Sequence, residues 1–75
     1  MGNPAQKYRY GGLVVEVRRI GEISQYVSRF ECLVRGFGHN NPAPRESYIV
    51  DASTNAAASR KALQNYIDNY GTQKH

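Results

Sequence analysis

The clearest structural pattern of this chain lies in Tyr48-Ile-Val-Asp-Ala-Ser-Thr54 and in the segment that follows it, Asn55-Ala-Ala-Ala-Ser-Arg-Lys-Ala-Leu-Gln-Asn-Tyr-Ile-Asp-Asn-Tyr-Gly71. The first part is typical of a β-strand and the second of an amphipathic helix. Ser53 or Thr54 can accept a hydrogen bond from a backbone N–H of the first helical turn, and Gly71 can adopt the left-handed conformation that ends a helix. Both ends of the helix are therefore marked in the sequence.

One stripe of the predicted helix is apolar. Leu63 stands at its centre and Ile67 follows four residues later, so the two lie on one face of the helix. The complete stripe consists of Ala56, Leu63, Ile67 and Tyr70, with Ala62 and Tyr66 beside it. The residues largely outside the stripe are polar: Arg60, Lys61, Gln64, Asn65 and Asp68. We therefore expect the helix to bury the stripe against a sheet and to expose its other side to water.

The length of 75 residues leaves room for a single domain with a modest core. A single cysteine, Cys32, excludes an internal disulfide and favours a reducing compartment. No apolar run approaches the roughly 18 residues that a membrane helix requires, and the first residues lack the apolar segment of a signal peptide. We expect a soluble cytoplasmic protein with a flexible or extended N-terminal arm over 1–12, one domain over 13–71 and a disordered tail over 72–75.

Residues 13–20, Leu-Val-Val-Glu-Val-Arg-Arg-Ile, are rich in β-branched side chains and predict a strand. Residues 24–35 also satisfy helical spacing, which would give a β-α-β-α chain, but Tyr, Val, Phe, Cys and Ser form strands better than helices. If Gly21-Glu22 forms a two-residue hairpin turn, Leu13 lies opposite Phe30. The apolar residues of both segments then share one face, and for this reason we favour the strand.

A loop over 36–44 and a third strand over 45–52 complete the predicted order of elements. We therefore predict an α+β fold, a three-stranded antiparallel meander with one C-terminal helix packed on one face (β-β-β-α). The predicted core face of the sheet consists of Leu13, Val15, Val17, Tyr26, Phe30, Cys32, Val34, Tyr48 and Val50. The opposite face stays in contact with water, and we call it the open face.

Residue patterns that support catalysis or metal binding are scarce. His39 has no second histidine or cysteine at ligand spacing, and Cys32 lies on the predicted core face, so neither a zinc site nor a Cys–His nucleophile is expected. Gly36-Phe-Gly38 lacks the third glycine of a dinucleotide-binding loop. We therefore predict a protein that is not an enzyme and that has no metal and no cofactor.

The charge pattern favours a binding function. The formal net charge is +4, and most of the excess is arginine, whose planar fork suits phosphate. Nucleic acid, either DNA or RNA, is accordingly the predicted partner. The predicted contacts are Arg18, Arg29 and Arg35 on the open face, together with Arg60 and Lys61 on the helix.

The alternative partner is a protein. Val27 and Leu33 are interleaved with arginines on the predicted open face, and this mixture also suits a seam between two copies of the chain. A non-catalytic protein–protein interaction or homodimerisation module, such as a small phage or bacterial regulatory or inhibitor protein, is therefore the alternative prediction. Neither interpretation involves a membrane.

In outline, three antiparallel strands followed by a helix over 13–70 resemble the C-terminal part of double-stranded-RNA-binding domains and the sheet-reading arm-binding domains of phage integrases. The RNA-binding family carries consecutive lysines at the start of this helix. This chain has Thr54, Asn55 and Ala56 there, and Arg60-Lys61 come more than a turn later. The resemblance is one of topology, and it assigns no family.

Overall fold

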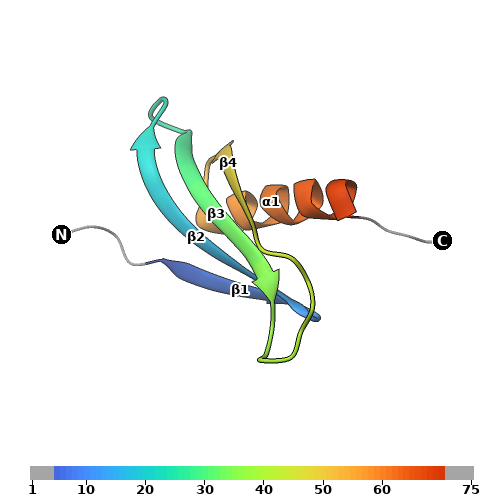
Figure 1. The fold of residues 1–75 in the computed structure, drawn as a ribbon. Helices are drawn as coiled ribbons and strands as arrows, with labels where there is room; N and C mark the ends of the chain where they lie inside the picture. Colours follow the sequence, from blue (N-terminus) through green and yellow to red (C-terminus); the bar gives the residue numbers. More distant parts are fainter. Residues whose placement is uncertain (1–4, 71–75) are drawn as a thin grey trace.

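Four antiparallel strands form one sheet, and a helix packs across one of its faces (Figure 1). The computed structural model describes residues 5–70. The elements are β1 (Gln6–Tyr10), β2 (Leu13–Glu22), β3 (Ser28–Gly36), β4 (Glu46–Ala52) and α1 (Asn55–Tyr70). The strands lie side by side in chain order. The predicted α+β class, with an antiparallel sheet and a C-terminal helix, is confirmed.

The sheet has one strand more than predicted, because β1 lies where the sequence predicted an arm and pairs with β2 along its whole length. Tyr8 and Tyr10 pack against the core, whereas Lys7 and Arg9 are exposed. Gly11 has a φ of 61°, a conformation that favours glycine, in the tight turn to β2. Only the tyrosines of β1 are apolar, and it has no β-branched residue, so the usual composition of a strand is missing.

The pairing of β2 with β3 is displaced by six residues from the predicted register, because Leu13 lies opposite Gly36 instead of Phe30. Val17 accordingly lies opposite Cys32. The displacement is even, so the residues that are paired in β2 and β3 keep their predicted faces although every pair has changed.

The cause of the displacement is a longer hairpin. β2 continues through the predicted turn at Gly21-Glu22, and a loop over 23–27 joins it to β3. The Ile23 N–H donates to the Val27 carbonyl at 2.9 Å and closes this loop. The loop carries Tyr26, which is 74% exposed and is not the core residue that we predicted. The rest of the predicted second strand is a strand, so the helical alternative is excluded.

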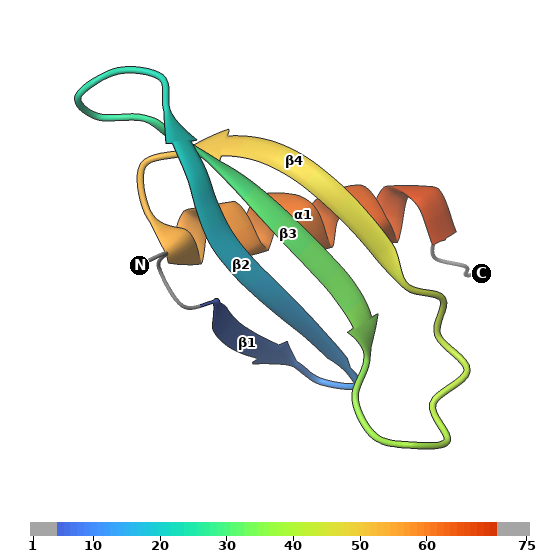
Figure 2. The same ribbon diagram turned by 60° about the vertical axis from the view of Figure 1, so that its left-hand side comes forward.

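The core lies between the sheet and α1 (Figure 2). Six of the predicted core-face residues are buried there: Val15, Val17, Phe30, Cys32, Val34 and Val50. Leu13 and Tyr48 pack at its edge. The helix contributes Ala58, Ala62 and Tyr66. Because the two alanines are small, the helix backbone can approach the sheet closely.

The buried face of α1 is turned by about one residue position from the predicted stripe. Leu63 is only partly buried and Ile67 is 39% exposed, so the predicted centre of the stripe is wrong. Alanine and serine add little to an apolar pattern, and for this reason the pattern selected the bulkier side chains. The Tyr66 hydroxyl also fixes the rotation of the helix, because it donates to the Pro44 carbonyl at 2.9 Å. The buried residues of the helix are Ala58, Ser59, Ala62 and Tyr66.

The helix begins at the predicted cap. Thr54 Oγ1 accepts a hydrogen bond from the Ala57 N–H at 3.0 Å. Gly71, predicted to end the helix, lies outside the described residues, as do residues 1–4 of the predicted arm and the predicted tail over 72–75. Within residues 5–70, no helix has both the length and the apolar character needed to cross a membrane.

Candidate nucleic-acid interface

The open face carries the three arginines that the sequence singled out, and each is bound to a carboxylate. Arg18 Nη2 lies 2.5 Å from Oε1 of Glu31, its partner in the strand register. Arg35 Nη2 lies 2.8 Å from Oε2 of Glu16 on the neighbouring strand. The side chains of the open face are Lys7, Arg9, Val14, Glu16, Arg18, Arg29, Glu31, Leu33, Arg35, Ser47, Ile49 and Asp51.

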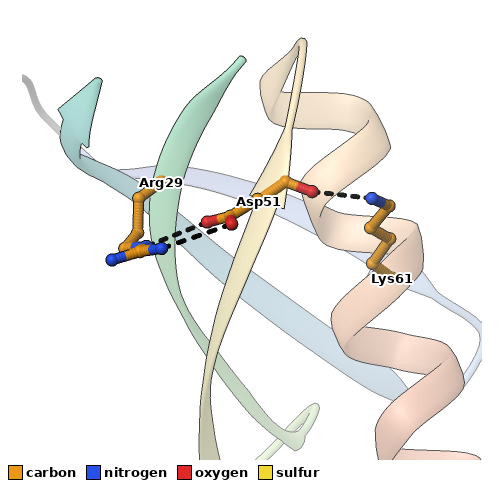
Figure 3. Close-up of polar contacts among 3 residues, drawn as sticks. All are labelled: Arg29, Asp51 and Lys61. Carbon is orange, nitrogen blue, oxygen red and sulfur yellow. Dashed lines mark hydrogen bonds and ion pairs between the residues drawn. The ribbon is translucent and has the colours of Figure 1, made fainter. Parts of the chain in front are cut away.

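The third arginine belongs to a group of three residues around the end of β4 (Figure 3). Arg29 Nε and Nη2 donate to Asp51 Oδ1 and Oδ2 at 2.9 and 3.3 Å. The hydrogen bond from Arg29 lowers the pKa of Asp51 below its usual value, and the same contact raises the pKa of Arg29. The Asp51 carbonyl accepts a hydrogen bond from Lys61 Nζ at 2.6 Å, on the side away from β3. Asp51 therefore holds both cations in place, and its carboxylate cancels the charge of Arg29.

The five predicted contact residues do not lie on one surface. Arg18, Arg29 and Arg35 lie on the open face, each beside its carboxylate partner. Arg60 and Lys61 lie on α1, which packs on the opposite face of the sheet (Figure 1). Arg18, Arg29 and Arg35 therefore add little net charge, and the two helix residues belong to an element on the other side of the sheet.

Two adjoining hollows lie at the end of the open face, where β1 meets the loop between β3 and β4. The larger measures about 540 Å³, and its walls include Arg35 and Arg45. The smaller measures about 320 Å³, and its walls include Lys7, Arg9 and again Arg35. The one carboxylate in these walls is that of Glu16. We call Lys7, Arg9, Arg35 and Arg45 the cationic corner.

The centre of the open face has the opposite charge balance. A hollow of about 310 Å³ lies there, and its charged walls are Glu16, Arg18 and Glu31. Two carboxylates therefore outnumber one cation. Positive charge is not spread over the sheet but gathers at the corner.

Three members of the cationic corner carry uncompensated charge. Across the part of the chain that the structure describes, Lys7, Arg9 and Arg45 take part in no ion pair within 4.0 Å. Arg35 is paired with Glu16, and this contact holds its guanidinium at the wall that the two hollows share. A concave surface lined mainly by one sign of charge concentrates the electrostatic potential, so the corner attracts anions.

The loop between β3 and β4 is fastened by Asn41. Its Nδ2 donates to the carbonyls of Gly12 at 3.0 Å and Phe37 at 3.3 Å, and its Oδ1 accepts from the Ala43 N–H at 2.9 Å. Gly36 leaves the space that this side chain needs, because a Cβ at that position would lie 2.4 Å from Asn41 Cγ. The loop therefore holds its shape through side chain–backbone bonds, and the hollows that it lines are preformed.

Arg9 stacks on the ring of Phe37. The central carbon of its guanidinium lies 3.8 Å from the ring centroid, and its Nε donates to the Gly11 carbonyl at 3.2 Å. The Phe37 N–H donates to the Gly12 carbonyl at 2.9 Å, which ties the ring to the turn after β1. Phe37 remains 47% exposed, whereas Val14, in the wall of the smaller hollow, is only 5% exposed. An accessible aromatic ring thus lies inside the cationic corner.

The described residues offer little support for a cysteine nucleophile or a metal site. Burial raises the pKa of the Cys32 thiol to about 11, with a smaller contribution from the charge of Glu31. The thiol therefore stays protonated at neutral pH and is a poor nucleophile. Among residues 5–70, no three histidine, cysteine, aspartate or glutamate side chains are grouped so that they could hold a metal ion.

Most residues of the cationic corner were not among the contacts that the sequence predicted. Lys7-Tyr-Arg-Tyr10 alternates cations with tyrosines, which is a pattern for a strand with one basic face. Phe37 and Arg45 flank a loop rich in glycine, asparagine and proline, and no local pattern shows which part of the sheet such a loop covers. Arg35 alone was among the predicted contacts.

No protein-family model, curated protein or solved structure matches this chain. The geometry and charge of the cationic corner therefore carry the functional argument.

Proposed function

We propose that this protein is a small basic nucleic-acid-binding domain, without catalytic activity, whose phosphate contacts are made by the cationic corner. The observation that carries the proposal is the charge around the two hollows. Four cations less one carboxylate leave +3 there, against +4 for the entire chain. Lysine and arginine contacts to phosphate supply most of the non-specific affinity of proteins for nucleic acids.

The arrangement of Arg35 supports phosphate as the ligand. Its guanidinium contacts Glu16 through Nε at 3.0 Å and Nη2 at 2.8 Å, and its Nη1 donates to the Gly36 carbonyl at 3.4 Å. These contacts orient the side chain and leave part of its five N–H donors for a ligand. A donor that is oriented before binding loses less conformational entropy when the ligand arrives.

The other predicted contacts take a secondary place in this proposal. Arg18 and Arg29 line neither hollow of the cationic corner, and each is paired with a carboxylate. Arg60 and Lys61 belong to α1, on the other side of the sheet. They can contact the same nucleic-acid strand as the cationic corner only if that strand wraps around the protein. We also propose a cytoplasmic location, because the chain keeps its one cysteine as a buried thiol.

The test is a salt-dependent titration of a fluorescently labelled oligonucleotide, followed by fluorescence anisotropy between about 50 and 200 mM salt. In a chain that carries both Lys7→Gln and Arg45→Gln, the slope of log affinity against log salt should fall by about 1.4 to 1.8, since each phosphate contact contributes about 0.7 to 0.9.

The matched control carries Arg18→Gln and Arg29→Gln, which remove the same amount of positive charge from the open face outside the cationic corner. We expect its slope to stay close to that of the wild type. Equal slopes in the two double variants would show that binding follows net charge and not the cationic corner. Absence of any salt-sensitive binding by the wild type would refute the proposed function.

A second candidate function is homodimerisation through β4, which forms one edge of the sheet. The Asp51 carbonyl points away from β3 (Figure 3), and alternate residues of an antiparallel strand direct their backbone groups to the same side. Ser47 and Ile49 therefore also turn their N–H and C=O groups outward, and the Ile49 side chain is 58% exposed. A second copy that pairs antiparallel around Ile49 would satisfy these groups.

Sedimentation velocity over a range of protein concentrations separates this candidate from the first. A dimer that Ile49→Lys dissociates would support pairing through β4, because a lysine on an edge strand opposes the approach of another strand. A wild-type protein that stays monomeric at all concentrations would exclude it.

A further inference from the structure

The two hollows of the cationic corner differ in chemical character. The smaller is walled by the ring of Phe37, by Val14 and by the stacked guanidinium of Arg9. The larger is walled by polar groups, among them Arg45 and the loop residue His39. The two hollows meet at Arg35 and Gly38, which line both. A compartment with an aromatic ring, an apolar wall and three cations therefore adjoins a more polar one that carries two arginines and one carboxylate.

Phe37, unlike the buried Phe30, lies at the surface. Its ring is not part of the core cluster, and its exposed fraction of 47% leaves much of the ring open to a ligand. The backbone hydrogen bond to Gly12 and the bond from Asn41 to the Phe37 carbonyl hold the residue in place. A fixed and accessible aromatic ring beside cations is the arrangement on which proteins stack unpaired bases.

We propose that the cationic corner takes an unpaired nucleotide of a single-stranded nucleic acid, with the base against the Arg9–Phe37 stack and the phosphate against Arg35 and Arg45. This inference rests on the proposed function and narrows its ligand. The base stacks either on the outer plane of the Arg9 guanidinium or directly on the ring of Phe37. Both modes require a base whose flat face is free.

A duplex does not offer such a face. Its bases are stacked on one another, so a protein reaches only their edges in the grooves, and a flat face becomes available only when a base is turned out of the helix. The ring of Phe37 can therefore stack with a base of a single strand but not with the paired bases of a duplex. Stacking tolerates every base, because each has an aromatic face, so we expect weak sequence preference.

The binding experiment uses the full chain with single strands of about 16 nucleotides and with a hairpin duplex of similar length. The wild type should prefer the single strand. Phe37→Leu keeps an apolar side chain but removes the aromatic face, so it should weaken single-strand binding by about 5- to 100-fold and leave duplex binding unchanged. Phe37→Tyr keeps the face and should retain the affinity.

Tyr26→Leu is the matched control, because Tyr26 is also an exposed aromatic residue, 74% exposed, but lies on the loop between β2 and β3. We expect it to leave both affinities unchanged. Arg45→Gln provides a second variant on the larger hollow. It should weaken single-strand binding and lower its salt dependence, while the affinity for an uncharged nucleoside stays unchanged.

The outcomes separate this inference from the proposed function. Equal affinity for the single strand and the duplex, together with no effect of Phe37→Leu on either affinity, would overturn the single-strand inference. The nucleic-acid function would then remain in place. Absence of binding to either ligand would overturn both. Competition by free dTMP or AMP at the same concentration as the strand would assign the corner to a mononucleotide and would also overturn the single-strand inference.

Discussion

The hydrogen bond between Tyr10 and Ser59 joins β1 to the buried face of α1. Tyr10 Oη and Ser59 Oγ lie 2.6 Å apart, and Ser59 Oγ donates to the Ala56 carbonyl at 2.7 Å. A serine hydroxyl has one hydrogen, so Tyr10 is the donor in its bond to Ser59. A double-mutant cycle on this pair therefore tests two features that the sequence did not predict, the added strand and the rotation of the helix.

The expected free energies follow from the partners that remain in each variant. Tyr10→Phe leaves the Ser59 hydroxyl bonded to Ala56, so it should lower the free energy of unfolding by about 1 kcal/mol, the net worth of one hydrogen bond. Ser59→Ala leaves the Tyr10 hydroxyl without its acceptor. Tyr10 is only partly buried, so water can replace the lost partner and the cost should be about 1 to 2 kcal/mol. The coupling free energy of the pair should be about 0.5 to 1.5 kcal/mol.

Urea unfolding followed by circular dichroism measures the four free energies of the cycle. A change of about 1 kcal/mol shifts the melting temperature of a domain of this size by about 4 to 8 °C, so thermal unfolding provides a second readout. Tyr8→Phe is the control, because the Tyr8 hydroxyl donates to Gln6 Oε1 at 2.8 Å on the exposed surface and should cost less than about 0.5 kcal/mol. A coupling free energy of zero between Tyr10 and Ser59 would refute the docking of β1 on α1.

Three further substitutions test the loop, the helix face and the ion pairs. Gly36→Ala places a methyl group 2.4 Å from Asn41 Cγ, so it should lower the melting temperature clearly, whereas Gly12→Ala, whose nearest neighbouring atom lies 3.9 Å away, should change it little. Ala62→Leu should cost about 1 to 3 kcal/mol in urea unfolding, because the fully buried alanine leaves no space for a larger side chain; a neutral result would contradict the buried face. The lowered pKa of Asp51 means that its contribution to stability is present above the usual carboxyl pKa and is lost as the pH falls through the folded-state value. Asp51→Asn should therefore flatten the acid side of a plot of stability against pH, and an unchanged acid slope would contradict the ion pair.

The sequence predicts the inward side chains well for a physical reason. Val17 and Phe30 each lie between two charged residues, and the side-chain period of a strand is two, so any even displacement of the register keeps them on one face. The helix can also be predicted from local sequence, because the residues that cap it and set its length lie within one segment. What the local pattern could not predict is the length of the loop over 23–27, and that length sets every cross-strand pair.

The change of register also alters the charge of the open face, because it determines which arginines form ion pairs. In the predicted register Gln25 lies opposite Arg18, so the arginine has no acidic partner across the hairpin. The observed register brings Glu31 opposite Arg18 and so cancels its charge. The number of arginines is evident from the sequence, but their net charge on a surface depends on pairing between strands. The cationic corner depends in addition on a loop that returns to the edge strand, and residues 37 and 9 are brought together only in the folded chain.

The most direct test of the cationic corner is the pattern of amide chemical-shift changes when the isotopically labelled full chain is titrated with a single-stranded oligonucleotide. The largest changes should fall on Lys7, Arg9, Phe37 and Arg45 and on the residues next to them, with small changes at Arg29. Changes centred on Arg18 and Arg29, or on α1 around Arg60, would contradict the assignment of the nucleic-acid interface to this corner.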